Sequence, residues 1–212
     1  MRSTVINRID HLVYASPDLV QGVDELEQRL GVLAKPGGRH PAWGTRNSLI
    51  ALGERIYLEV IAPDPDQIAP ERARPFGIDD LDSPRLASWA AREADLEHIV
   101  TTARNLGIDL GAIYPGNRQT ADGTVLSWKL TDPLTTRYDG LLPFFIDWGT
   151  TPHPAPTAAP GCALIELRAE HPDADRLRAV LTALDLDLTV TAGESPSLIA
   201  TISSPRGVVE LR

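Results

Sequence analysis

An internal repeat is the sequence feature that most constrains how this chain folds. Three stretches can be aligned on Asp18, Asp95 and Asp173: HLVYASPDLVQGVDELEQRLG, SWAAREADLEHIVTTARNLG and ELRAEHPDADRLRAVLTALDL. In each, a short strand-like run leads into a segment whose apolar residues recur at steps of three and four, as on one buried face of a helix. We therefore expect one supersecondary unit to be used three times.

Each predicted helix is followed by short apolar runs that read as β-strands. The turn sequences LGER, ADGT and SPRG separate neighbouring runs, as hairpins require. Ser16 is the expected N-cap of the first helix, with Pro17 at its first helical position. Every unit thus predicts the order βαβββ, and the fold class is α+β.

The units suggest two domains joined by connectors. Residues 1–155 are predicted to form the first domain, with modules at 5–63 and 84–150, and residues 156–212 a C-terminal module. Two proline-rich stretches without periodicity, APDPDQIAPERARPFGIDDLDSP and GTTPHPAPTAAPG, are expected to connect the units.

Composition excludes several classes of protein. The 212 residues carry a net charge of −9 without a basic run interleaved with aromatic residues, so a nucleic-acid partner is not expected. No apolar stretch approaches the roughly 18 residues of a membrane span, and no signal sequence is evident, so a cytoplasmic location is expected. Cys162 is the single cysteine, which excludes an internal disulfide and a Cys-rich zinc site. Any metal must therefore use histidine and carboxylate ligands.

Polar residues interrupt the apolar strands at matching places in the repeats. His11 lies seven residues before Asp18, and the corresponding first-strand residues of the other units are Ser88 and Glu166. The last strands carry Glu59, Asp147 and Glu210. A carboxylate in an apolar strand is costly unless it is paired, hydrogen-bonded or bound to a metal. Repetition of that cost suggests that these residues line a shared cavity.

The pattern resembles the vicinal oxygen chelate superfamily, which includes glyoxalase I, extradiol dioxygenases and bleomycin-resistance proteins. More narrowly, the chain is similar to bacterial glyoxalase-like domains, on the strings IDHLVYASPDL, GGRHPAWGTRNSLIALGERIYLEVIAPDP, GNRQTADGTVLSWKL and LPFFIDWGTTPHP. The resemblance covers about residues 5 to 154 well and the last unit more loosely. It implies two βαβββ modules paired into a cup-shaped sheet, with the third module appended.

The resemblance also implies a site inside the cup. Carried onto this sequence, it makes His11, Glu59 and Asp147 ligands of a divalent metal, Mn, Fe, Ni or Zn, while Ser88 departs from the usual ligand types. His11 and Glu59 are the expected catalytic residues of lyase, isomerase or dioxygenase chemistry. The expected substrate-binding residues are His40, Trp43, Arg46, Asn47 and Arg118. No organic cofactor is expected.

Several alternatives stay open from the sequence alone. Module one could pair with module three, which would place Glu166 and Glu210 beside His11 and Glu59. Glu59 and Asp147 could pair with arginines, and the protein would then be a metal-free binder of a drug or metabolite, as bleomycin-resistance proteins are. A phosphate loop, a nucleophile elbow, an HExxH motif and a dinucleotide fingerprint are all lacking, so hydrolase and kinase readings have no support. We expect a small-molecule ligand and a monomer or homodimer.

Overall fold

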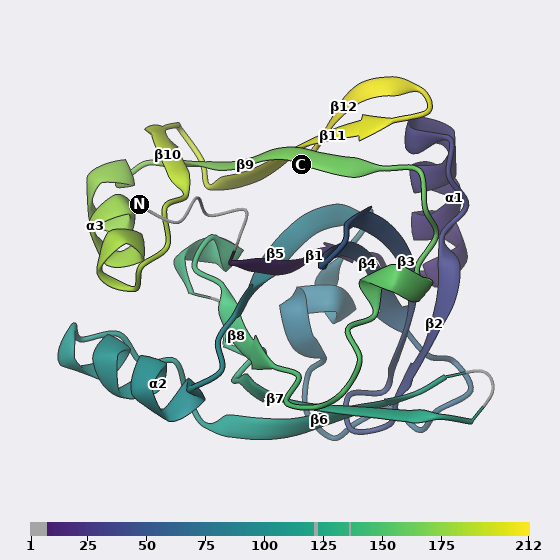
Figure 1. Ribbon diagram of the computed structural model, residues 1–212, viewed down its shortest axis with the longest axis horizontal. Coiled ribbons are helices and arrows are strands. Elements are labelled where there is room, and N and C mark those ends of the chain that lie inside the picture. Colours follow the sequence, from purple (N-terminus) through teal and green to yellow (C-terminus); the bar gives the residue numbers. More distant parts are fainter. Residues whose placement is uncertain (1–7, 121–122, 136) are drawn as a thin grey trace.

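The computed structural model describes residues 8–120, 123–135 and 137–212, so the start of the first predicted module, residues 5–7, lies outside the described part. All three modules have the predicted order of a strand, a helix and three strands (Figure 1). The first module comprises β1 (Ile9–Ala15), α1 (Leu19–Leu30), β2 (Lys35–His40), β3 (Thr45–Gly53) and β4 (Ile56–Pro63). The second comprises β5 (Arg85–Arg92), α2 (Leu96–Asn105), β6 (Ile113–Gln119), β7 (Val125–Thr131) and β8 (Phe144–Asp147). The third comprises β9 (Ala163–His171), α3 (Ala174–Ala183), β10 (Thr189–Ala192), β11 (Ser197–Ser204) and β12 (Gly207–Leu211). Short 3-10 turns in the connecting segments are η2 (Pro75–Asp80), η3 (Tyr138–Gly140) and η4 (Ala155–Thr157).

The three aspartates that align the repeats are the N-caps of the three helices. The side chains of Asp18, Asp95 and Asp173 each accept a hydrogen bond from the backbone N–H three residues later. Such a bond satisfies one of the free N–H groups at a helix N-terminus. The expectation that Ser16 caps the first helix is therefore wrong, and the Ser16 hydroxyl instead donates to the Asp18 backbone carbonyl.

Modules one and two close into a barrel with the strand order β1-β4-β3-β2-β6-β7-β8-β5. Within each module the first strand runs parallel to the last, β1 to β4 and β5 to β8. Two seams join the modules. At the first seam β1 pairs with β5 along most of its length, whereas at the second, the one pair of β2 and β6 among the described residues is Arg39–Gln119. The pairing of module one with module two is thus confirmed.

The third module repeats the order of elements but not their pairing. Its strands form a separate sheet in the order β10-β9-β11-β12, in which β9 runs parallel to β10, the strand directly after the helix. The last strand, β12, lies at the sheet edge. Glu166 and Glu210 are both exposed, so they do not join the cavity residues of module one. The alternative pairing of modules one and three does not occur.

Two apolar clusters organise the molecule. One fills the barrel interior and includes Val13, Ile61 and Phe144. The other joins the outer face of the barrel to α1, α2 and the third module, which lies against the barrel as the upper layer in Figure 1. Because this second cluster spans residues on both sides of position 155, the division into two domains there stays a prediction.

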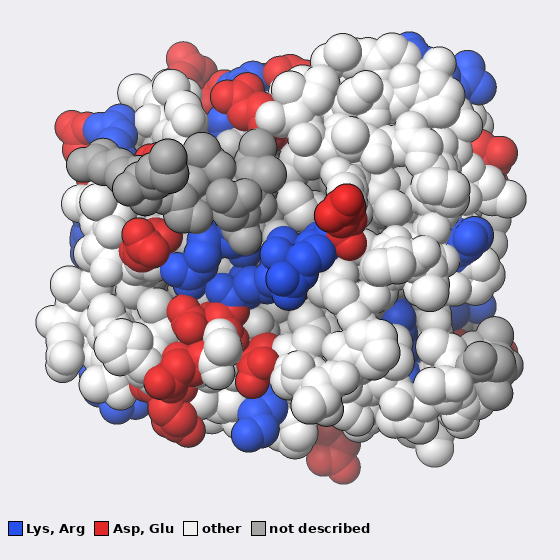
Figure 2. Space-filling view, viewed as in Figure 1, with Lys and Arg blue, Asp and Glu red and all other residues white. Residues whose placement is uncertain are grey.

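Charged side chains of both signs are mixed on the surface. Figure 2 shows basic and acidic residues side by side over the left half of the face seen in Figure 1, and a largely uncharged right half. Within the described residues, none of the helices combines the length and the apolar character that crossing a membrane would require.

Gly140 illustrates how tightly η3 packs on β5. At Gly140 (φ +88) an added Cβ would lie 2.1 Å from the Ala87 carbonyl oxygen, whereas at Gly207 (φ +99) no atom lies within 4 Å of it. Both substitutions to alanine suffer backbone strain of about 1–2 kcal/mol. We expect Gly140→Ala to cost at least about 1–3 kcal/mol more, because the backbone must move. Urea unfolding of both variants measures the difference, and equal losses would contradict the close packing.

Candidate functional site

A cavity of about 50 Å³ lies inside the barrel. Its wall is mostly apolar and aromatic, with one polar end. The lining residues are His11, His40, Trp43, Asn47, Tyr57, Glu59, Ile61, Pro75, Phe76, Arg118, Trp128, Leu130, Pro133, Phe144, Ile146 and Trp148. An apolar cavity with a few convergent polar groups is the usual form of a small-molecule site.

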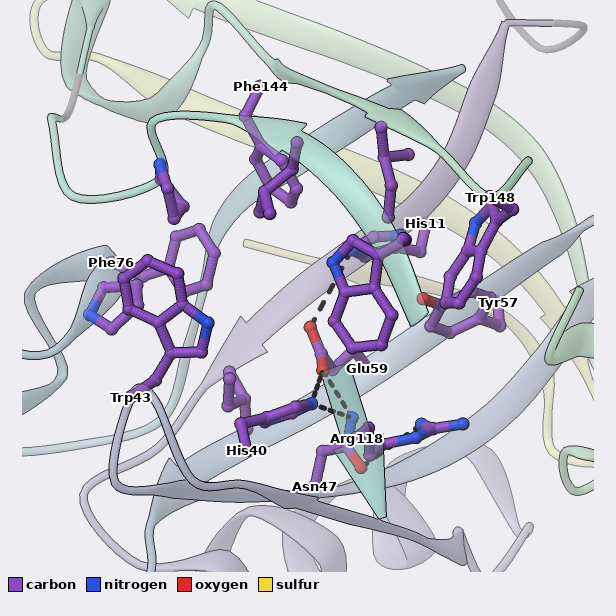
Figure 3. Close-up of a pocket in the computed structure, with 16 residues that line it drawn as sticks. His11, His40, Trp43, Asn47, Tyr57, Glu59, Phe76, Arg118, Phe144 and Trp148 are labelled. Carbon is purple, nitrogen blue, oxygen red and sulfur yellow. Dashed lines mark hydrogen bonds and ion pairs between the residues drawn. The ribbon is translucent and has the colours of Figure 1, made fainter. Parts of the chain in front are cut away.

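The strand register brings the polar residues together. In the parallel pair β1 and β4, His11 lies opposite Tyr57, and Glu59 follows two residues later on the same face. Asn47 from β3 and His40 from β2 lie on the other side of Glu59 (Figure 3).

Glu59 is the centre of the polar end, although its side chain is only 9% exposed. Its Oε1 accepts a hydrogen bond of 2.5 Å from Asn47 Nδ2. The Nε2 atoms of His11 and His40 lie 3.8 and 3.9 Å from Oε2 and Oε1, respectively. These two separations are too long for hydrogen bonds. Oε2 therefore has no hydrogen-bond partner among the residues the structure describes.

Arg118 fixes the orientation of the Asn47 amide. The guanidinium can only donate, and its Nη1 donates to Asn47 Oδ1 at 3.4 Å. The Asn47 NH₂ group must then face Glu59 and, at 3.5 Å, His40 Nε2. His40 Nε2 is consequently an acceptor, and the proton of this ring lies on Nδ1, 3.0 Å from Thr45 Oγ1. Burial lowers the pKa of His40 to about 4, despite the nearby Glu59 charge, so the ring is neutral at pH 7.

Behind His11 lies Asp10, whose side chain is fully buried. Its carboxylate is 2.8 Å from His11 Nδ1, 3.2 Å from His153 Nε2 and 3.2 Å from Trp148 Nε1. Burial alone would raise the pKa of Asp10, but the hydrogen bonds from His11 and His153 hold it well below its usual range. Asp10 is therefore an ionised carboxylate that only accepts hydrogen bonds.

Aromatic rings hold His11 in place. Tyr57 stacks on the imidazole with ring centroids 4.6 Å apart, and Phe144 contacts it edge-on at 5.5 Å. Burial, together with the Asp10 and Glu59 charges, raises the pKa of Tyr57 well above its ordinary value. The phenol is therefore neutral.

The connector between β4 and β5 covers the cavity through Pro75 and Phe76. Phe76 has a positive φ of 63°, a left-handed conformation that is strained for a bulky residue. A cavity that holds benzene measures about 150 Å³. The cavity of about 50 Å³ is smaller than that but open on one side, so a ligand of that size either extends past the mouth or needs the side chains at this cover to move.

Most of the predicted site residues meet in this cavity. The structure brings together His11, His40, Trp43, Asn47, Glu59 and Arg118. It places three other residues elsewhere. Arg46 alternates with Asn47 on β3 and lines an outer groove together with Arg39. On β8, Phe144 and Ile146 line the cavity, so Asp147 faces away and accepts from the backbone N–H of Gly149. Ser88 lies where the β1–β5 register shifts and borders a separate small pocket.

Several residues of the site are not among those predicted from the sequence. Tyr57 was detectable, because it lies two residues before Glu59 and so on the same face of β4. Asp10 gave no signal, since strand alternation points it away from the cavity. Phe76, Trp148 and His153 belong to, or directly adjoin, connectors without periodicity, and only the tertiary structure places them.

The donor atoms do not fit a first-row metal where they stand. For a metal ~2.1 Å from both His11 Nε2 and Glu59 Oε2, the N–metal–O angle would be about 130°. Neighbouring ligands in octahedral or tetrahedral sites enclose about 90–110°. Asp147, the third predicted ligand, is absent from the cavity lining. Within residues 8–120, 123–135 and 137–212, no group of three or more His, Cys, Asp or Glu is arranged to hold a metal ion.

Comparison with known protein families identifies the fold. The model of the glyoxalase-like domain matches residues 9–184, which is most of the chain. The chain belongs to the glyoxalase-like domain family. The predicted resemblance to glyoxalase-like domains is thereby confirmed.

Solved structures are similar to this chain at low sequence identity. A hypothetical protein from Staphylococcus aureus is 13% identical, with a TM-score of 0.60 over 95% of this chain and 83% of its own. A methylmalonyl-CoA epimerase from Mycobacterium tuberculosis is 18% identical, with a TM-score of 0.44 over 69% of this chain and 91% of its own. A comparison with curated proteins gives no significant match.

The low pKa of His40 predicts a pH-dependent stability. Unfolded His40 takes up a proton near pH 6.5, but the folded protein does so only near pH 4. The unfolded state therefore binds more protons in this window, and the free energy of unfolding falls by about 3 kcal/mol from this group as the pH drops through it. Urea unfolding between pH 4 and 7 should show this loss in the wild type and much less of it in His40→Gln. The exposed His98→Gln variant is the control, and a parallel pH dependence in all three proteins would refute the assignment.

Proposed function

We propose that this protein binds a small, largely apolar molecule inside the barrel, with the polar end of the ligand against His11 and Glu59. The observation that carries the proposal is the cavity itself, in which a buried carboxylate with a free oxygen faces a wall of aromatic rings. Binding in such a site gains from apolar burial, and the few polar groups set the orientation of the ligand. Glu59 is also the group placed to take a proton from the ligand.

Tryptophan side chains offer an internal test of binding. Trp43, Trp128 and Trp148 line the cavity, whereas Trp89 lies outside it and donates to the Leu141 carbonyl. In NMR spectra of ¹⁵N-labelled protein, small aromatic and aliphatic fragments should shift the three cavity indole signals and leave Trp89 unchanged. Glu59→Gln should weaken fragments whose polar end carries a positive charge about tenfold or more, while Asp147→Asn, outside the cavity, should not. If no fragment shifts a cavity indole, or Trp89 shifts equally, the proposal fails.

Metal-dependent lyase, isomerase or dioxygenase chemistry is the second candidate. The observation in its favour is that His11, His40 and Glu59 approach one another at one end of the cavity. Side-chain movement would have to bring these atoms closer before they held an ion.

Elemental analysis separates the two candidates. Protein purified without a histidine tag is assayed for Mn, Fe, Ni and Zn, alongside the Glu59→Gln and Asp147→Asn variants. The binding proposal predicts less than about a tenth of an equivalent of any metal in all three. About one equivalent that is lost in Glu59→Gln and kept in Asp147→Asn would establish the metal-dependent alternative.

A further inference from the structure

The hydrogen bonds around Asp10 determine which nitrogen of His11 carries the proton. Trp148 Nε1 can only donate, and it faces both Asp10 oxygens. His153 Nδ1 accepts from the Ala155 backbone N–H, so the proton of its ring lies on Nε2 and points to Asp10. Surrounded by donors, Asp10 accepts from His11 Nδ1 as well. In the neutral ring, His11 Nε2 therefore faces the cavity with a lone pair.

A proton on His11 Nε2 would have no partner. The nearest acceptor is Glu59 Oε2 at 3.8 Å, beyond hydrogen-bonding distance. Two acceptors, one of them charged, thus face the same small space without a donor between them. A ligand that carries a donor can therefore take the place of water and satisfy both acceptors at once.

The spacing of the two acceptors favours one chemical class. At an atom ~2.9 Å from both acceptors, the angle between the directions to the two acceptors is about 80°. Two N–H bonds of one nitrogen can form both hydrogen bonds with modest deviations from linearity. A hydroxyl has a single hydrogen, and a carboxylate has none and would be repelled by Glu59. A positive charge on the nitrogen compensates the Glu59 carboxylate.

The nearby basic groups do not oppose a cation at this point. His40 Nε2 accepts from the Asn47 amide, so it presents no proton toward this point. Arg118 lies beyond Asn47, to which it donates, on the Oε1 side of Glu59 (Figure 3).

We propose that the polar end of the ligand is a protonated primary amine bound between His11 Nε2 and Glu59 Oε2, and that Asp10 is the positioning residue that keeps His11 an acceptor. This inference rests on the proposed binding function and adds the substrate class. The class is a small amine with an apolar or aromatic body.

Three probes of equal shape test the ligand class. Benzylamine, benzyl alcohol and benzoate require the same opening of the cavity cover, so the difference between their affinities reports the polar end alone. Titrations followed by the cavity indole signals should give benzylamine a Kd at least tenfold below that of benzyl alcohol, and no binding of benzoate. If benzyl alcohol or benzoate binds as tightly as benzylamine, the amine class is overturned. If other fragments bind and benzylamine does not, the class is also overturned while the binding function stands. If nothing enters the cavity, the binding function itself falls and the amine proposal with it.

Asp10→Asn tests the positioning role. The carbonyl of the new amide would accept from Trp148 and His153, and its NH₂ group would face His11 Nδ1, which moves the ring proton to Nε2. A wrong histidine tautomer is known to cost an enzyme far more than the geometry alone suggests. The ¹⁵N signals of the His11 ring should exchange their protonated and unprotonated positions, and benzylamine should bind at least tenfold more weakly. Asp147→Asn is the same substitution outside the cavity, and it should change neither measurement.

Glu59→Gln keeps the proposal testable if Asp10→Asn does not fold. This variant retains the shape of the side chain and removes its charge. Benzylamine should lose at least tenfold in affinity, and benzyl alcohol less than threefold. Equal losses for the two probes, or an unchanged His11 tautomer in a folded Asp10→Asn variant, would overturn the proposal.

Discussion

The buried carboxylate of Asp10 is the interaction on which the site depends. A fully buried charge is tolerated only with several hydrogen bonds, and Asp10 obtains them from β1 itself through His11 and from the segment after β8 through Trp148 and His153. One carboxylate thus ties the first strand of the barrel to a chain segment about 140 residues away. It also orients a cavity imidazole. Asp10 therefore both holds two distant chain segments together and positions the His11 ring.

Much of the fold could be predicted because it rests on local patterns. The aspartates that align the repeats are the helix caps, and the apolar periodicity marks the buried helical faces. The strand pairing of the third module could not be predicted from such patterns. The sequence of β9–α3 resembles that of β1–α1, yet β9 runs parallel to β10, whereas β1 runs parallel to β4. Long-range strand choice depends on which apolar surfaces meet, and the sequence does not display those surfaces.

The site was predictable where regular strands supply it. His11, Glu59 and Asn47 follow from alternation on β1, β4 and β3. The predicted ligand Asp147 lies one residue away from the inward position on β8, which Ile146 occupies, and Ser88, which aligns with His11 in the repeat, lies at a register irregularity. A shift of one position reverses the face of a strand, so an alignment of repeats without their pairing cannot fix such corners. The connectors supply the cover of the cavity and two of the hydrogen-bond partners of Asp10. Their sequences have no apolar periodicity from which these positions could be predicted.

The two seams of the barrel differ in the number of described backbone pairs that join the modules. Along β1 and β5 the halves share a long ladder, but among the described residues β2 and β6 meet at one residue pair, Arg39 and Gln119. The Arg118–Asn47 hydrogen bond also joins the two modules on this side, at the polar end of the cavity. The two halves of the barrel are thus joined by many backbone pairs on the side of Asp10 and His11, and by few described backbone pairs and a side-chain hydrogen bond on the side of His40 and Arg118.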